Sequence, residues 1–238
     1  LYTQEEIANA GKGTDWFSLI TRTGNIQQHN LTVSGGSKTT KYMLSGNYYN
    51  HKGIIKNSGL KRFSVRTNID QEINRFARVG LNLTASQINN DNSQISGEGN
   101  ENSGIIRSAL EMSPHIKARD EFGNYPRDPL NPLRPNPYSL LTISDRGRVE
   151  RVLLNAYSEI TPVKNLVFHL KAGIDRGTTK RWNYLPRTTL HGERENGRAS
   201  IAGSDQNSYL FEGTGSYSFE PFAGHSVNML LGASSQRF

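Results

Sequence analysis

Stretches of about ten residues in which apolar and polar side chains alternate return eight times along this chain, and each ends at a turn or loop. A period of two places apolar side chains on one face of a strand and polar side chains on the other. The pattern therefore predicts an all-β chain. The expected strands are residues 27–34, 39–50, 60–72, 76–88, 148–161, 165–177, 206–220 and 225–236.

The connections between these strands alternate in length. Short turns are expected near residues 36, 74, 163 and 222, and longer loops near residue 55, at about 89–147 and at about 178–205. Transmembrane β-barrels have this arrangement, with short turns on the periplasmic side and long loops outside the cell. We therefore predict an antiparallel transmembrane β-barrel segment, about eight strands of a larger up-and-down barrel, with long extracellular loops.

The composition agrees with strands that are apolar on one face only. Hydrophobic residues make up 34% of the chain and the mean hydropathy is −0.64, which is little for a globular core. No apolar run approaches the roughly 18 residues of a transmembrane helix. The first six residues are polar and acidic, not a signal peptide, so we expect an internal fragment or a chain whose leader has been removed. Without cysteine, disulfides and thiolate metal sites are excluded.

A net charge of +7 allows an anionic partner such as nucleic acid. The lysines and arginines are dispersed, however, and form no basic run. We expect them on the polar faces of strands and in loops, and we predict no nucleic-acid partner.

Two segments lack the strand pattern. Residues 1–26 contain an expected short helix at Glu5–Ala10, ended by Gly11, and a tryptophan, Trp16, that we expect to be buried. The segment 89–147 is first polar, then helix-like at 104–112, and then holds six of the nine prolines. Loops of this length are usually functional or disordered, and proline restricts the backbone, so we expect much of this one to be ordered.

Several motifs resemble SusC/RagA-like TonB-dependent outer-membrane transporters. They keep the family's order and spacing over residues 14–88 and recur in the long loop. The matching segments are 14–16, 30–37, 42–48, 53–59, 61–70, 80–83, 109–114 and 120–125.

The resemblance implies outer-membrane import of large nutrients, oligosaccharides or peptides, without covalent chemistry. It also implies a SusD-like surface lipoprotein as partner, and TonB acting through segments that would precede residue 1. Residues 1–26 would be the plug-to-barrel junction and residues 27–238 part of the receptor barrel. Such barrels have about 22 strands around a plugged lumen, so eight strands cannot close one, and their free edges would aggregate alone.

Two groups of residues are candidates for binding. Polar side chains on two neighbouring strands are expected to face the lumen, where they contact cargo or, alternatively, only water or the plug: Arg62, Arg66, Asn68, Asp70, Arg78 and Asn82. Tyrosine and arginine side chains in the long loop at 89–147 are expected to contact the lid or cargo, or alternatively to pack loop on loop: Tyr125, Arg127, Arg134 and Tyr138. Trp182 is a further candidate loop contact, whose ring offers a surface on which a sugar can stack.

No catalytic residue, metal site or cofactor is predicted, so the chain is not expected to be an enzyme. The six histidines lack metal-ligand spacing, the segment 91–97 lacks the ligand order of a calcium loop, and no carboxylate pair stands out. Two alternatives to an importer remain: a non-transport outer-membrane barrel, and a soluble carbohydrate-binding β-sandwich. A sandwich would bury its apolar faces against each other.

Overall fold

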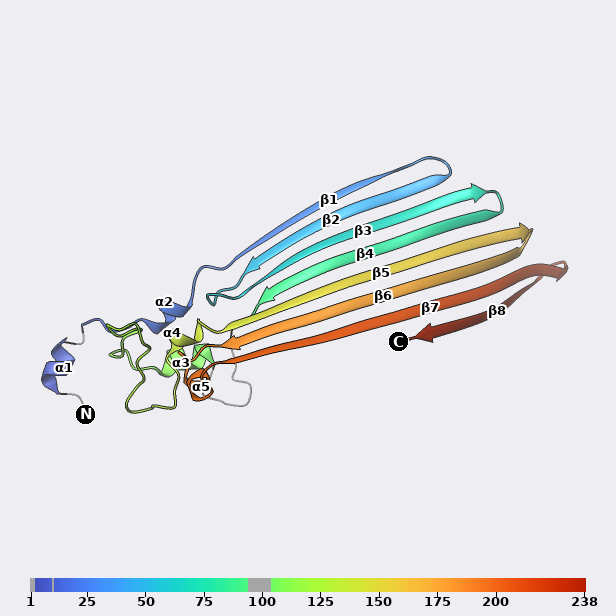
Figure 1. The fold of residues 1–238 in the computed structure, drawn as a ribbon. Coiled ribbons are helices and arrows are strands. Elements are labelled where there is room, and N and C mark those ends of the chain that lie inside the picture. Colours follow the sequence, from blue (N-terminus) through green and yellow to red (C-terminus); the bar gives the residue numbers. More distant parts are fainter. Residues whose placement is uncertain (1–2, 10, 94–103) are drawn as a thin grey trace.

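The computed structural model describes residues 3–9, 11–93 and 104–238. In this part of the chain eight strands form one antiparallel sheet, in which each strand pairs with the next along the sequence (Figure 1). The number and order of strands confirm the prediction, and the sheet is open, with β1 and β8 at its edges. The strands are β1 (Asn25–Gly36), β2 (Thr40–Lys52), β3 (Gly59–Asn74), β4 (Ala77–Asp91), β5 (Ser144–Val163), β6 (Leu166–Leu185), β7 (Arg198–Phe222) and β8 (His225–Arg237).

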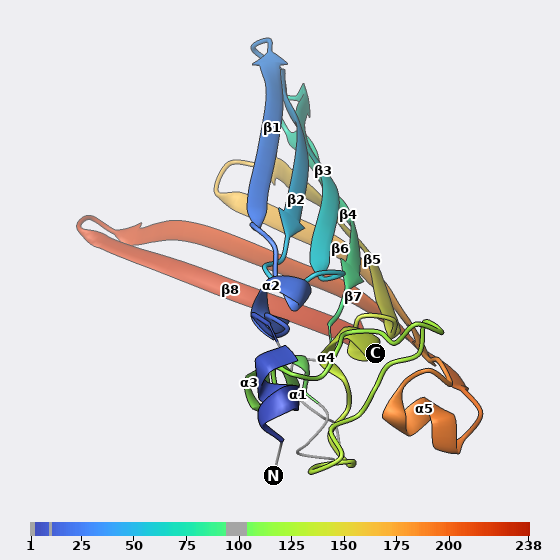
Figure 2. The ribbon, with the colours of Figure 1, turned by 90° about the vertical axis from the view of Figure 1, so that its left-hand side faces the viewer.

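The two ends of the sheet differ as the connection lengths predict. The turns after β1, β3, β5 and β7 lie at one end, and the long connections and helices lie at the other (Figure 1). Asn165 completes the turn between β5 and β6 at φ +67°, a conformation that asparagine tolerates better than most residues. The strand direction rotates steadily from β1 to β8, which is the normal twist of a sheet (Figure 2).

The strand register gathers the apolar side chains of all eight strands on one face. Leu44, for example, pairs with Val33 on β1 and with Thr67 on β3. We call this surface the apolar band. Its larger members are Leu31, Val33, Leu44, Phe63, Val65, Ile69, Leu81, Leu83, Val152, Leu154, Ile160, Phe168, Leu170, Ile174, Phe211, Met229 and Leu231.

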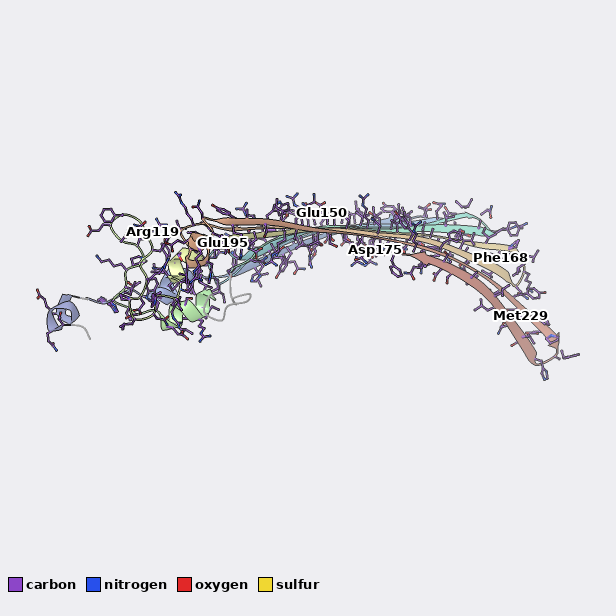
Figure 3. All side chains as sticks on the ribbon, turned by 60° about the horizontal axis from the view of Figure 1, so that its bottom comes forward. Arg119, Glu150, Phe168, Asp175, Glu195 and Met229 are labelled. Atoms are coloured by element: carbon purple, nitrogen blue, oxygen red, sulfur yellow. The ribbon has the colours of Figure 1, made fainter. Side chains whose placement is uncertain are left out.

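The apolar band is uncovered. Within the described residues no helix and no second sheet lies over it, and the sheet seen edge-on is a single curved layer (Figure 3). Leu31 is 72% exposed and Phe211 is 59% exposed. A β-sandwich would cover this face with a second sheet. On β5 the band runs from Val152 to Ile160, about 27 Å along the strand at about 3.4 Å per residue, close to the ~25 Å apolar belt of outer-membrane barrels.

The predicted loop at 178–205 is wrong in extent. β6 continues to Leu185 and β7 begins at Arg198, which leaves only residues 186–197 as a connection. The loop predicted at 89–147 is likewise shortened at both ends, and its residues 94–103 lie outside the described residues. Beyond the apolar band both faces of β6 and β7 are mixed and largely polar, so the alternation disappears from the sequence although backbone pairing continues.

The helices are α1 (Gln4–Asn9), α2 (Trp16–Ile20), α3 (Ile105–Glu111), α4 (Pro137–Leu140) and α5 (Leu190–Arg194). Within the described residues no helix is long and apolar enough to cross a membrane. Asp15 is the N-cap of α2, and its side chain accepts a hydrogen bond from the Ser18 amide at 3.1 Å.

A small hydrophobic core lies beyond the end of the sheet, where α2, α3 and α4 pack together. We call residues 14–22, 53–58 and 104–143 the loop cluster. Trp16 is 3% exposed, as expected, and its indole Nε1 donates to the carbonyl of Ser113 at 3.1 Å. The core of the loop cluster consists of Trp16, Ile20, Ile55, Ile105, Ala109, Met112, Ile116 and Leu140.

Candidate functional site: the polar face and the loop cluster

The face opposite the apolar band is polar, and the structure brings all six predicted lumen-facing residues together on it. Arg66 pairs across the sheet with Ser45 and Thr84, and Asn68 pairs with Asn82. The six residues on two adjacent strands are Arg62, Arg66, Asn68 and Asp70 on β3, with Arg78 and Asn82 on β4.

Ion pairs on this polar face concentrate on β5, β6 and β7. Arg151 forms two hydrogen bonds with Asp175, at 2.8 and 2.5 Å, and Lys171 lies 3.3 Å from Glu212. Both pairs join adjacent strands, so the charges in this half of the face satisfy one another.

The arginines of β3 have no such partners among the described residues. The Arg62 guanidinium lies 5.4 Å from the centre of the Tyr49 ring and donates only a long hydrogen bond, 3.5 Å, to Asn47. Its Nε is buried without a hydrogen-bond partner. A buried donor without a partner is costly, so Arg62 is a site where an added acceptor would be stabilising.

A row of amide side chains crosses the polar face beside Arg66. Asn68, Asn82 and Asn155 pair directly across β3, β4 and β5, and the Asn68 Oδ1 atom is buried without a partner. Each amide offers donors and acceptors, so the row can bind hydroxyl groups or peptide groups equally well.

Asp70 is engaged by a residue that the sequence did not single out. The hydroxyl of Tyr157 on β5 donates a hydrogen bond to Asp70 Oδ1 on β3. The ring passes over Gly80 of the intervening strand, where a Cβ atom would collide with it. A glycine inside a regular strand often marks such a close approach, and this was the available signal.

In the loop cluster, Tyr125 and Tyr138 meet around Arg119, which was not predicted. The Arg119 guanidinium lies 4.9 Å and 5.6 Å from the two ring centres, and its Nη2 donates to the Tyr125 hydroxyl at 2.6 Å. Figure 3 shows Arg119 at this end of the molecule. The two tyrosines therefore hold a cation of their own chain, which favours the alternative of loop-on-loop packing.

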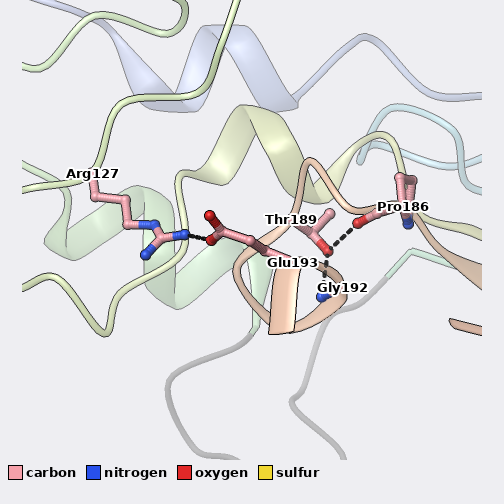
Figure 4. Close-up of polar contacts among 5 residues, drawn as sticks. All are labelled: Arg127, Pro186, Thr189, Gly192 and Glu193. Atoms are coloured by element: carbon pink, nitrogen blue, oxygen red, sulfur yellow. Dashed lines mark hydrogen bonds and ion pairs between the residues drawn. The ribbon is translucent and has the colours of Figure 1, made fainter. Parts of the chain in front are cut away.

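Arg127 forms an ion pair with Glu193 of α5 and so links the two long connections (Figure 4). α5 is positioned by Thr189, whose hydroxyl donates to the carbonyl of Pro186 at 2.9 Å and accepts from the Gly192 amide at 3.1 Å. This pair again joins loop to loop.

Arg134 is buried and pairs with Glu111, which also accepts a hydrogen bond from Arg107 at 3.0 Å.

Trp182 is not part of the loop cluster. It lies on β6, on the same side of the sheet as the apolar band, where it pairs with Arg146 and Ile201.

Asp145 and Arg181 hold together the ends of β5 and β6 nearest the loop cluster. Arg181 donates to both carboxylate oxygens of Asp145, at 2.8 and 2.5 Å. This hydrogen bonding lowers the pKa of Asp145 below its usual value.

Among the described residues, no three histidine or carboxylate side chains lie together where they could hold a metal ion.

Comparison with known proteins gives the chain a family context. TonB-dependent receptor P3 of Formosa agariphila is 30% identical over 98% of this chain. The chain is a homologue of TonB-dependent receptors. TonB-dependent receptor SusC of Bacteroides thetaiotaomicron is 36% identical over 56 residues, which are 24% of this chain and 6% of SusC. No family model matches the chain.

The fold agrees with this relationship. The structure of the RagAB peptide transporter matches 96% of this chain with a TM-score of 0.73 and 24% identity. The RagAB peptide importer in its closed-closed state matches the same share with a TM-score of 0.71. The chain spans about a quarter of these proteins, 24% of receptor P3 and 27% of the RagAB chain. Its location is the outer membrane, and its relatives are receptors, not enzymes.

Proposed function

We propose that residues 27–238 form part of the wall of a nutrient importer in the outer membrane. The observation that carries this proposal is the register, which places the apolar side chains of eight strands on one uncovered face and the polar side chains on the other. In a barrel the first face contacts lipid and the second lines the lumen. The named relatives support import through the lumen, powered by TonB.

The polar face is proposed to contact cargo through Arg62, Arg66 and the amide row. The support is the contrast between the paired charges of β5–β7 and the two arginines of β3, together with the buried, unpartnered atoms of Arg62 and Asn68. Amides and guanidinium groups bind both peptides and glycans, and a RagAB chain of similar fold is a peptide importer. We propose peptide or oligosaccharide cargo.

The loop cluster is proposed to face outward, beneath a SusD-like lipoprotein. The support is its compact core at the end of the sheet where long connections gather. Residues 1–26 are proposed as the plug-to-barrel junction. Because α2 packs among residues 105–140, a junction built from this segment would meet the wall at the extracellular end.

An uptake assay tests the proposal. Cells that lack the gene for this receptor are supplied with labelled peptide or oligosaccharide mixtures, and uptake is restored with the wild-type gene. We expect restored uptake of one cargo class that disappears when TonB is absent. The proposal would be contradicted if the gene changed the uptake of neither peptides nor oligosaccharides.

A variant then tests the site. Arg62→Gln with Arg66→Gln should lower uptake while the amount of receptor in the outer membrane stays unchanged. Lys38→Gln with Lys164→Gln removes the same charge at two exposed turns and should leave uptake unchanged. Equal uptake by the two double variants would exclude the arginines from cargo contact.

A further inference from the structure

The face that carries the apolar band becomes basic where the band ends toward the loop cluster. On β3, Lys61 is the next residue on this face beyond Phe63, and on β6, Arg176 is the next beyond Ile174. Counting only the residues on this face, Arg148 is the second residue beyond Val152 on β5. Lys180 is the third residue beyond Ile174 on β6. We call Lys61, Arg148, Arg176 and Lys180 the basic belt.

Three of the four belt residues lie in one row across the sheet, and Arg176 lies two positions away from Lys180 on the same face of β6. The register joins Lys61 to Asn89, Asn89 to Arg148 and Arg148 to Lys180 across four adjacent strands. At about 4.8 Å between strands, this row spans about 14 Å. All four cationic side chains are exposed, so they can reach the same neighbouring molecules.

The belt carries more positive charge than its surroundings neutralise. Three carboxylates lie nearest the belt on this face: Glu150, which accepts a hydrogen bond from Gln87 at 3.2 Å, Asp205, and Asp91, which pairs with Arg146 at 3.6 Å. Arg148 donates to the neutral Asn89 side chain at 3.1 Å, and no ion pair joins a belt residue to a carboxylate among the described residues.

Among the residues that the structure describes, no matching belt lies on the strands at the opposite edge of the band. Toward the short turns this face carries Phe168, Met229 and Leu231 (Figure 3 labels the first two). Along the strands of this face, the basic side chains therefore lie at the end with the long loops, which in an outer-membrane barrel faces outside the cell. At this end of the band the barrel wall meets the headgroups of the outer leaflet. The phosphate groups of lipid A give that surface a negative charge, opposite to that of the belt.

We propose that the basic belt binds the phosphate groups of lipid A. The inference depends on the outer-membrane location and goes beyond the proposed import function. Two guanidinium groups can bind phosphate bidentately and two ammonium groups add point charges. Trp182 lies on the same face next to Lys180, at the level where aromatic rings favour a membrane interface. This gives Trp182 a lipid-facing role in place of cargo contact.

The test measures lipid binding to the full-length receptor that carries this chain, purified in a neutral detergent. Diphosphoryl lipid A, dephosphorylated lipid A, phosphatidylglycerol and inorganic phosphate are each titrated, and binding is followed by native mass spectrometry. We expect diphosphoryl lipid A to bind more tightly than the other three. The triple variant K61Q/R148Q/K180Q should bind it at least about tenfold more weakly.

The matched control removes three exposed charges at the short-turn end, K38Q/R75Q/K164Q, and should bind lipid A like the wild type. Equal binding by the belt variant and the control would overturn the proposal. So would equal binding of dephosphorylated lipid A or phosphatidylglycerol, or competition by inorganic phosphate at the same concentration. Uptake of cargo, measured in parallel, tests the import function separately from the lipid site.

Discussion

Tyr157 reaches across a whole strand to donate its hydroxyl hydrogen to Asp70, and Gly80 lies beneath the ring on the strand between them. The three residues occupy one row of the register, on β5, β4 and β3. This contact ties three strands together by side chains as well as by backbone hydrogen bonds. It requires that the middle strand carry no side chain at this point.

Gly80→Ala is therefore expected to destabilise the sheet. The added Cβ would collide with the Tyr157 ring, and forcing an extra methyl into a filled site typically costs about 1–3 kcal/mol. The measurement is denaturant unfolding of the full-length receptor in detergent, followed by tryptophan fluorescence.

Gly46 provides the control, because a Cβ there would meet nothing within 4 Å. Gly46→Ala should leave the unfolding midpoint nearly unchanged. The double variant Gly80→Ala with Tyr157→Ala should lose less stability than the two single losses added together. Strict additivity would show that the ring and the glycine do not interact.

The strands could be predicted from the sequence where contact with lipid requires one apolar face. Their extensions beyond the apolar band could not be predicted. Between Val152 and Ile160 one face must be apolar, so the period of two is visible. From Thr178 to Leu185 neither face needs to be apolar, so the sequence pattern predicts a loop where β6 in fact continues. The six lumen-facing candidates follow from the same alternation, because their face is fixed once the strand is known.

Partners across strands were not predictable in the same way. Asp70 and Tyr157 are 87 residues apart, and only the register of three strands reveals their contact. In the long loop, Arg134 is an arginine, a residue type that is common at binding hot spots. Its burial against Glu111 depends on how the loop folds. Nothing local in the sequence marks that difference.

Trp16→Ala is expected to loosen the loop cluster without disturbing the sheet. Trp16 is almost fully buried at the centre of the cluster core, and removing such a side chain typically costs about 3–5 kcal/mol. Limited proteolysis should therefore cut residues 112–143 faster in the variant. Trp16→Phe keeps most of the packing and loses the hydrogen bond to Ser113, so it should show a smaller effect. Equal cleavage of all three proteins would contradict the packing.

Asp145→Asn is expected to lower stability at neutral pH only. The hydrogen bonds from Arg181 lower the pKa of Asp145, so the pair stabilises the folded state above the unfolded carboxyl pKa of about 3.9. This contribution is lost as the pH falls through the folded pKa. The variant should be about 1–3 kcal/mol less stable than wild type at pH 7, and the difference should shrink at acid pH.

Denaturant unfolding at several pH values measures this difference. Asp205→Asn is the control, since Asp205 is exposed and makes no ion pair among the described residues. A difference between Asp145→Asn and wild type that stays constant down to pH 2 would show that the charge of Asp145 is not what matters.

Leu154→Arg and Asn155→Arg place the same charge on opposite faces of one strand. Leu154 pairs with Leu83 and Ile174 within the apolar band, whereas Asn155 pairs with Asn82 and Gly173 on the polar face. An arginine on the lipid side near the bilayer midplane costs about 2–4 kcal/mol, and on the lumen side it remains hydrated. We therefore expect Leu154→Arg to reduce the amount of folded receptor in the outer membrane, measured by its heat-dependent mobility on gels, and Asn155→Arg to leave it near the wild-type level. The reverse order would mean that the apolar face points inward, and the barrel wall would have to be abandoned along with every function argued from it.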